Sequence, residues 1–278
     1  MLKSLKQLGE RVIDDDITAL AAQLAYDLLL SFFPFILLLL TMLSYSDLKS
    51  TYVMEYLHQI VPKSAFDLIY TTVISMSRSA TGNLLSLSII GTIWSGSSGF
   101  RAIIKGLNKA YDEEETRPYW KTLAISILFM VGLALTIILA VALVVFGQML
   151  GKHIATRLNL SNSFILNWDI IRYLVSLIAM AFTFASLYHF TPCRRLTWSE
   201  VLPGAIFSTL GWLISSLGFA YYVNNYNNYS GAYGGIGAVI VLMLWLYITS
   251  IIILLGGEVN ALLAFQKQGK EKPKRKRY

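Results

Sequence analysis

The residues of this chain that could do chemistry are a few ionisable or polar side chains set inside long apolar runs. Asp27 lies within the first run, and Glu258 and Asn260 lie close to the end of the last one. An ionisable group near the centre of a membrane helix costs roughly 2.5–3.5 kcal/mol on insertion scales, so such a residue suggests a functional site. Glu258 also has a plainer interpretation, in which it bonds a backbone group or reaches the lipid–water interface.

Basic residues recur at helical spacing in the second half of another apolar segment. Arg101, Lys105 and Lys109 follow one another every four residues and predict a basic stripe along one helix face. We expect Glu258 to pair with Arg101 or Lys105, because these residues are predicted at the same ends of their helices. The other candidates for a substrate path or a coupling site are Trp94, Ser95 and Asn108.

Catalytic and metal-binding patterns are missing from the sequence. The three histidines are scattered and form neither His-x-His nor His-Glu-x-x-His. The acidic run Asp112–Glu115 is typical of a solvated loop, and Cys193, the single cysteine, has no evident base partner. We therefore predict no enzymatic activity, no metal site and no cofactor.

The elements that position these residues follow from composition. Hydrophobic residues make up 55% of the 278 residues, charged residues only 14%, and mean hydropathy is +0.58. An average soluble chain has about 25% charged residues, so this chain lacks the charge to cover a soluble surface. Since disordered chains are polar and poor in aromatic residues, the composition indicates an integral membrane protein.

Charge-free intervals predict an all-α bundle of transmembrane helices, each of about 20 mostly apolar residues. Six helices are expected, over residues 18–43, 84–106, 120–150, 168–191, 200–223 and 235–264. We assign residues 1–17 to a cytoplasmic segment at the membrane interface, 18–265 to the transmembrane domain and 266–278 to a basic cytoplasmic tail. The first outer loop, 44–83, carries apolar residues at helical spacing and predicts amphipathic interfacial helices.

The distribution of Lys and Arg predicts the orientation. Seventeen of them fall on the side of the two termini and five on the other side. Positively charged segments stay in the cytoplasm, so both termini are predicted inside the inner (plasma) membrane. The basic tail is expected to attract anionic lipid head groups. A nucleic-acid patch is the alternative for this tail, and we expect no nucleic-acid partner.

Small residues form two seams that predict close helix packing. In the second predicted helix they are Gly91, Ser95 and Gly99, and in the fifth they are Gly204, Ser208, Gly211, Ser215 and Gly218. Static packing is one interpretation. The other is a moving interface, because small-residue segments at corresponding places in two halves of a chain are typical of transporter sites.

Three stretches together resemble the BrkB/YihY family of bacterial inner-membrane proteins. They are AAQLAYDLLLSFFPFILLL (21–39), GTIWSGSSGFRAIIKGLNKAYDEEETRPYW (91–120), and a third that runs from YHFTPCRRLTW at 188 to LLGGEVNAL at 254–262. The resemblance implies a multi-pass membrane protein over about residues 10–265. It also brings an old ribonuclease label, which the residue chemistry does not support, and Asp27 departs from the uncharged residue expected there.

These observations favour a transporter or flippase-like protein for an amphiphilic or anionic substrate, with a lipid as one candidate. The alternative is a scaffold for envelope assembly that transports nothing, and a membrane-bound ribonuclease comes third. Formation of a homo-oligomer is possible on this sequence. The sequence does not specify a substrate.

Overall fold

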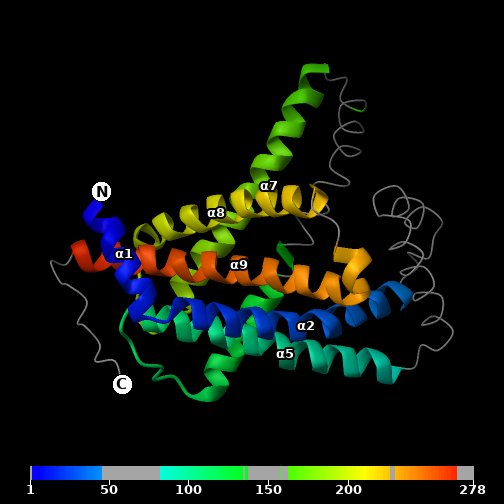
Figure 1. The fold of residues 1–278 in the computed structure, drawn as a ribbon, viewed down its shortest axis with the longest axis horizontal. Coiled ribbons are helices and arrows are strands. Elements are labelled where there is room, and N and C mark those ends of the chain that lie inside the picture. Colours follow the sequence, from blue (N-terminus) through cyan, green and yellow to red (C-terminus); the bar gives the residue numbers. More distant parts are fainter. Residues whose placement is uncertain are drawn as a thin grey trace. The chain divides into compact units, whose positions relative to one another are not determined.

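The computed structural model describes residues 2–45, 82–133, 135–136, 157, 162–225 and 229–267, and helices are its only regular elements there (Figure 1). The helices are α1 (Leu2–Asp14), α2 (Ile17–Tyr45), α5 (Gly82–Ala110), a segment over Tyr119–Leu133, α7 (Asn162–Phe190), α8 (Trp198–Asn225) and α9 (Tyr229–Lys267). The described part of the chain therefore confirms the all-α prediction.

A helix occupies part or all of each of the six ranges predicted to cross the membrane. Three stretches are long and apolar enough for a crossing: Ile170–Phe190, Trp198–Val223 and Val239–Lys267. Shorter apolar stretches cover Ile17–Ser31 and Tyr119–Leu133. Six crossings and the orientation of the termini stay predictions. The amphipathic helices expected in the first outer loop fall mostly on residues 46–81, which lie outside the described residues, as does most of the basic tail.

The chain divides into two compact units. One consists of Met1–Ala25 with Phe100–Tyr278, and the other of Tyr26–Gly99, so that the division passes through α2 and α5. In the first unit α9 packs along α8, α8 packs against α7, and α1 lies against the C-terminal part of α9 (Figure 1). This arrangement brings the first helix of the chain to the last.

The two faces of α8 carry side chains of different size and exposure. Gly204 and Ser208 on one face are buried. The opposite face is a stripe of large exposed side chains at three- and four-residue spacing: Leu202, Ile206, Leu210, Ile214, Leu217 and Tyr221. An apolar stripe of this kind suits acyl chains, whereas small residues allow a neighbouring backbone to approach.

Local sequence signals set the helix ends around the site. Thr197 and Glu200 form a capping box at the start of α8, in which the Thr197 amide donates to Glu200 Oε2 at 2.8 Å. At the end of α5 the Glu113 amide donates to the Asn108 carbonyl at 2.9 Å, with Asp112 at φ 58°. This is a Schellman motif in which aspartate takes the left-handed position that glycine usually fills.

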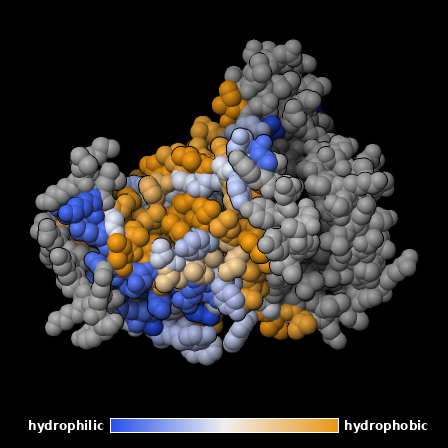
Figure 2. All heavy atoms as spheres, viewed as in Figure 1, coloured by the Kyte–Doolittle hydropathy of each residue, from blue (hydrophilic) through white to orange (hydrophobic). Residues whose placement is uncertain are grey.

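Hydrophilic residues gather at one end of the first unit, near the contact between α1 and the end of α9, whereas hydrophobic residues cover much of the adjoining helix surface (Figure 2). The polar end is also where α5 terminates and where the connection from α7 to α8 passes. The candidate site lies there.

Candidate functional site

The centre of the site is a buried ion pair between the first and last helices. Arg11 Nε donates to Glu258 Oε2 at 2.8 Å, and the two side chains are 8% and 0% exposed. Arg11 Nη2 donates to the Ala110 carbonyl at 2.7 Å. That carbonyl is in the last turn of α5, where no intrahelical donor reaches it, so the guanidinium also caps the helix. Arg11 thereby joins α1, α5 and α9.

Apolar packing surrounds the ion pair. Ile17, Leu20 and Ala21 of α2 form a buried cluster with Leu254 of α9, and Val12 of α1 packs against it. At Gly106 the backbone of α5 comes so close to α9 that an added Cβ would lie 2.5 Å from Leu254 Cδ2. The charged groups are therefore held among close-packed apolar groups, where water screens them poorly.

A second carboxyl and a phenol share this environment. Asp15 is 1% exposed, and it acts on the carboxyl of Glu258 through its charge and as a hydrogen-bonding group. Among the described residues, no hydrogen-bond partner reaches Glu258 Oε1 or the hydroxyl of the buried Tyr111. Burial raises the pKa of Tyr111 well above its ordinary value. Arg194 lies over the ring of Tyr111, with its guanidinium carbon 5.7 Å from the centroid.

The partner predicted for Glu258 was wrong. Glu258 pairs with Arg11, because α1 docks on α9 and places its guanidinium next to the carboxylate. Arg101 lies over the ring of Tyr119 at 5.8 Å, and Lys105 is exposed. Lys109, the last residue of the predicted basic stripe, pairs with Asp16 at 2.9 Å.

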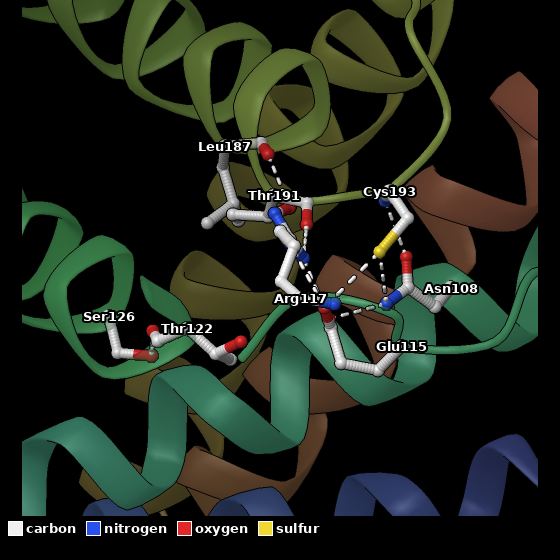
Figure 3. Close-up of polar contacts among 8 residues, drawn as sticks. All are labelled: Asn108, Glu115, Arg117, Thr122, Ser126, Leu187, Thr191 and Cys193. Atoms are coloured by element: carbon white, nitrogen blue, oxygen red, sulfur yellow. Dashed lines mark hydrogen bonds and ion pairs between the residues drawn. The ribbon is translucent and has the colours of Figure 1, made fainter. Parts of the chain in front are cut away.

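A polar network next to the ion pair connects the loop after α5 with the connection between α7 and α8 (Figure 3). Asn108 Nδ2 donates to Glu115 Oε2 at 2.9 Å, and Asn108 Oδ1 accepts from the Cys193 amide at 2.7 Å. The Cys193 thiol donates to Glu115 Oε1 at 3.2 Å. Arg117 holds Glu115 in a bidentate pair at 2.7 Å and donates to the Thr191 carbonyl at 2.6 Å.

The charges of this network act strongly on one another. Hydrogen bonds from Arg117 lower the pKa of Glu115 to about 2, against a smaller opposing effect of burial. The same contacts raise the pKa of Arg117. Both groups are therefore charged at neutral pH, and the prediction that the acidic run is simply solvated does not apply to Glu115.

Asn260 joins α9 to the start of α8. Its Oδ1 accepts from the Gly204 amide at 2.6 Å, and its Nδ2 donates to the Val201 carbonyl at 3.1 Å. A Cβ at Gly204 would lie 2.1 Å from the Gly256 carbonyl oxygen and 2.4 Å from Asn260 Nδ2. Only glycine allows this approach, and the side-chain amide makes its hydrogen bonds only because the backbones are this close.

Tyr188 of α7 completes the contact. Its hydroxyl lies 2.6 Å from Ser208 Oγ and donates to the Ile253 carbonyl at 2.7 Å. A Cβ at Gly256 would lie 2.0 Å from Ser208 Oγ and 2.3 Å from the Tyr188 hydroxyl. Three helices therefore meet in a buried polar layer with no room for additional atoms.

Packing along the predicted small-residue seam of α8 becomes looser toward the C-terminal end of the helix. At Gly211 an added Cβ would meet Ile252 Cγ2 at 3.2 Å, a tight but adjustable contact. Ser215 is half-buried. At Gly218 no atom of the described residues lies within 4 Å of an added Cβ.

The second unit contains the other candidates. Ser98 Oγ of α5 donates to Asp27 Oδ1 of α2 at 3.0 Å, which gives the carboxylate of Asp27 a partner. Trp94 is 75% exposed. Gly91 is half-buried and Gly99 is buried on α5, and the side chain of Ser95 lies outside the described residues.

Sequence reasoning missed Arg11 and Asp15. Arg11 follows Leu8 by three residues and precedes Asp15 by four. That spacing continues the apolar stripe of Leu5 and Leu8 and could have indicated burial. Cys193 carried no such signal, because its partners Asn108 and Glu115 lie far away along the chain, and the same holds for the contact of Arg117 with the Thr191 carbonyl.

Where the structure describes side chains, no group of three or more His, Cys, Asp or Glu residues is placed to hold a metal ion. The polar groups described above are three arginines, three carboxyls, two phenols, a thiol, a serine hydroxyl and two carboxamides. Such a set can bind and release protons, and it can bind charged groups.

Comparison with known proteins adds the family. The family model described as Virulence factor BrkB matches residues 8–278. The chain is 39% identical over 264 residues to the "Putative ribonuclease-like protein YfkH" of Bacillus subtilis (strain 168), covering 95% of this chain and 96% of that protein. It is 30% identical over 280 residues to a "UPF0761 membrane protein" of Alteromonas mediterranea, covering 96% of this chain and 90% of the relative. No solved structure matches the chain significantly. The chain is a membrane protein and belongs to the Virulence factor BrkB family.

Proposed function

We propose that this protein carries an amphiphilic or anionic substrate, such as a lipid, across the bacterial inner membrane. The observation that carries the proposal is the Arg11–Glu258 ion pair, which is buried at the end of a long apolar helix. Burying two charges costs several kcal/mol per ion, which their attraction only partly offsets. Charged groups retained at such a place typically mark ion or substrate pathways.

The polar end of the first unit is the proposed cytoplasmic mouth. Exposed aromatic residues at the ends of helices near this end, including Tyr119, Trp120 and Trp198, suit the lipid–water interface. These aromatic residues, together with the Lys and Arg residues on the same side, support an orientation in which both termini lie in the cytoplasm. Anionic head groups of membrane lipids are the partners that this surface would attract.

Asp27, Trp94, Ser95, Arg101 and Lys105 remain candidates for the substrate path. Asn108 belongs to the network with Glu115, and we assign it a positioning role at the mouth. Glu258 and Asn260, on the same helix, fix α9 against α1 and α8 respectively. A transport cycle would have to break the contact of Glu258 with α1.

A scaffold is the second candidate function. The observation that favours it is the close contact of α7, α8 and α9 around Gly256, which leaves no space for those helices to slide. A scaffold would keep the charged cluster closed at all times. The ribonuclease-like name of the Bacillus relative belongs to that protein, and the residue set described above offers no independent support for RNA cleavage here.

Lipid movement in reconstituted vesicles tests the proposal. Purified protein is placed in vesicles of phosphatidylethanolamine and phosphatidylglycerol that contain a trace of fluorescent NBD-labelled phosphatidylglycerol, and dithionite quenches the probe in the outer leaflet. The wild-type protein should expose probe from the inner leaflet, and Glu258→Gln should slow this step. Glu113→Gln, an exposed carboxylate in the loop after α5, is the matched control. Wild-type vesicles that behave like protein-free vesicles would rule out transport of this lipid class and favour the scaffold.

A further inference from the structure

Two buried carboxyl groups, those of Asp15 and Glu258, lie at the contact between α1 and α9, where Glu258 pairs with Arg11. Glu258 Oε2 accepts from Arg11, Glu258 Oε1 has no hydrogen-bond partner among the described residues, and Asp15 acts on this carboxyl as a charge and as a hydrogen-bonding group. A carboxylate only accepts hydrogen bonds, so two ionised carboxylates side by side cannot bond each other. The arrangement becomes satisfied when one proton lies between them.

The charges around the pair come from every element packed against it. Arg11 and Asp15 belong to the first helix and the turn that follows it, and Tyr111 follows α5. Arg194 lies in the connection before α8 and Glu200 in its first turn, and both act electrostatically on Tyr111 together with Glu258. Arg194 lies over the rings of Tyr111 and Phe265, whose centroids are each 5.7 Å from its guanidinium carbon, so it is also occupied by aromatic contacts.

We propose that Asp15 and Glu258 bind one proton between them, and that this proton holds α1 closed against α9. Two like charges in a buried site disfavour each other, so such a pair retains one proton. The proton lies on the hydrogen bond between the Asp15 carboxyl and Glu258 Oε1, and on release it passes to water at the polar end of the unit. No other bond is made or broken.

Loss of the proton leaves two carboxylates opposite Arg11 and weakens the attachment of α1. Besides the buried hydrogen bond from Arg11 Nη2 to the Ala110 carbonyl, α1 and its turn make exposed polar contacts: Gln266 Nε2 donates to Gln7 Oε1 at 3.0 Å, and Lys109 pairs with Asp16. An exposed ion pair such as Lys109–Asp16 contributes little to stability, because water screens its charges. Asp16 at φ 52° lies in the turn between α1 and α2, where the first helix can pivot.

The proton site rests on the proposed transport function in one respect only, namely that binding and release of the proton would drive a transport cycle. Proton release would open the mouth, and proton binding would close it. The proton site itself can be tested without any transport measurement.

The test is a disulfide cross-link between Gln7→Cys and Gln266→Cys in a Cys193→Ser background. The yield is measured with a mild oxidant from about pH 6 to about pH 9, the range in which a carboxyl pair that shares a proton releases it. The same thiols are placed in an Asp15→Asn background, in which a neutral amide can donate to Glu258 Oε1. The ratio of the two yields at each pH removes the pH dependence of disulfide chemistry.

We expect the ratio of the wild-type to the Asp15→Asn yield to fall by at least about threefold as the pH rises over this range. Asp16→Asn, which changes the neighbouring exposed carboxylate, should follow the wild-type background. If Asp15→Asn does not fold, Asp15→Ser with the same thiols replaces it, since it also leaves one carboxyl and keeps the Arg11–Glu258 ion pair.

A ratio that stays constant would overturn the proton site, as would a yield that follows sodium concentration instead of pH. A falling ratio in a protein that moves no lipid in vesicles would support the site and reject the transport function. Lipid movement together with a constant ratio would reject the proton site alone.

Discussion

Gly204→Ala is the most direct test of the contact between α8 and α9. The added Cβ would lie 2.1 Å from the Gly256 carbonyl oxygen and 2.4 Å from Asn260 Nδ2. A backbone oxygen cannot rotate away, so the helices must separate. Overpacking of this kind typically costs about 1–3 kcal/mol.

Separation also affects the two hydrogen bonds of Asn260, to Gly204 and Val201. Leaving a buried polar group unsatisfied costs about 1–3 kcal/mol. The better helix propensity of alanine returns up to about 1 kcal/mol. The net loss of stability should therefore be roughly 2–4 kcal/mol.

Gly218→Ala is the matched control on the same helix, because no atom in the part of the chain that the structure describes lies within 4 Å of its added Cβ. It should leave stability unchanged or raise it by up to about 1 kcal/mol through helix propensity. The stability of both variants is measured by heating the protein in detergent and using size-exclusion chromatography to determine how much of it stays folded. Equal melting of Gly204→Ala and Gly218→Ala would refute the contact as described.

The other predictions concern charged residues. In a double-mutant cycle, Glu258→Gln and Arg11→Gln should each destabilise by about 3–5 kcal/mol, and the double mutant by clearly less than their sum, as measured by unfolding in detergent; additive losses would contradict the ion pair. Because the pKa of Glu115 is lowered to about 2, its pairing should stabilise the fold above about pH 4.5 and lose that effect as the pH falls toward 2. Glu115→Gln should therefore reduce the acid sensitivity of the melting temperature, whereas the exposed Glu114→Gln should not. The purified protein should leave RNA intact on a gel, because the Glu115 carboxylate is held by Arg117; cleavage that disappears in Glu115→Gln would overturn this.

The helices could be predicted from the sequence because apolar length depends only on local composition. A helix occupies each predicted interval, and Gly204 and Ser208 lie on the buried face that their spacing indicated. The partner of Glu258 could not be predicted in the same way. Periodicity places a residue on a helix face, but it does not say which distant helix packs there.

The network around Cys193 was beyond sequence reasoning for a related reason. Its contacts join residues 108–117 to residues 191–193, and each depends on the exact ends of two helices. The Schellman motif after α5 uses Asp112 in place of glycine, so the usual signal for the end of a helix was absent.

The ion pair of Arg11 with Glu258 also has a consequence for biosynthesis. The two residues are 247 positions apart. At about 5–20 residues per second, the ribosome needs roughly 10–50 s to reach Glu258 after Arg11 has been made. During that time the arginine has no α9 to bind, so the N-terminal helix cannot take its final position. Closure of this end must therefore be among the last events of assembly, and a chain truncated before α9 would leave the insertion machinery with α1 undocked.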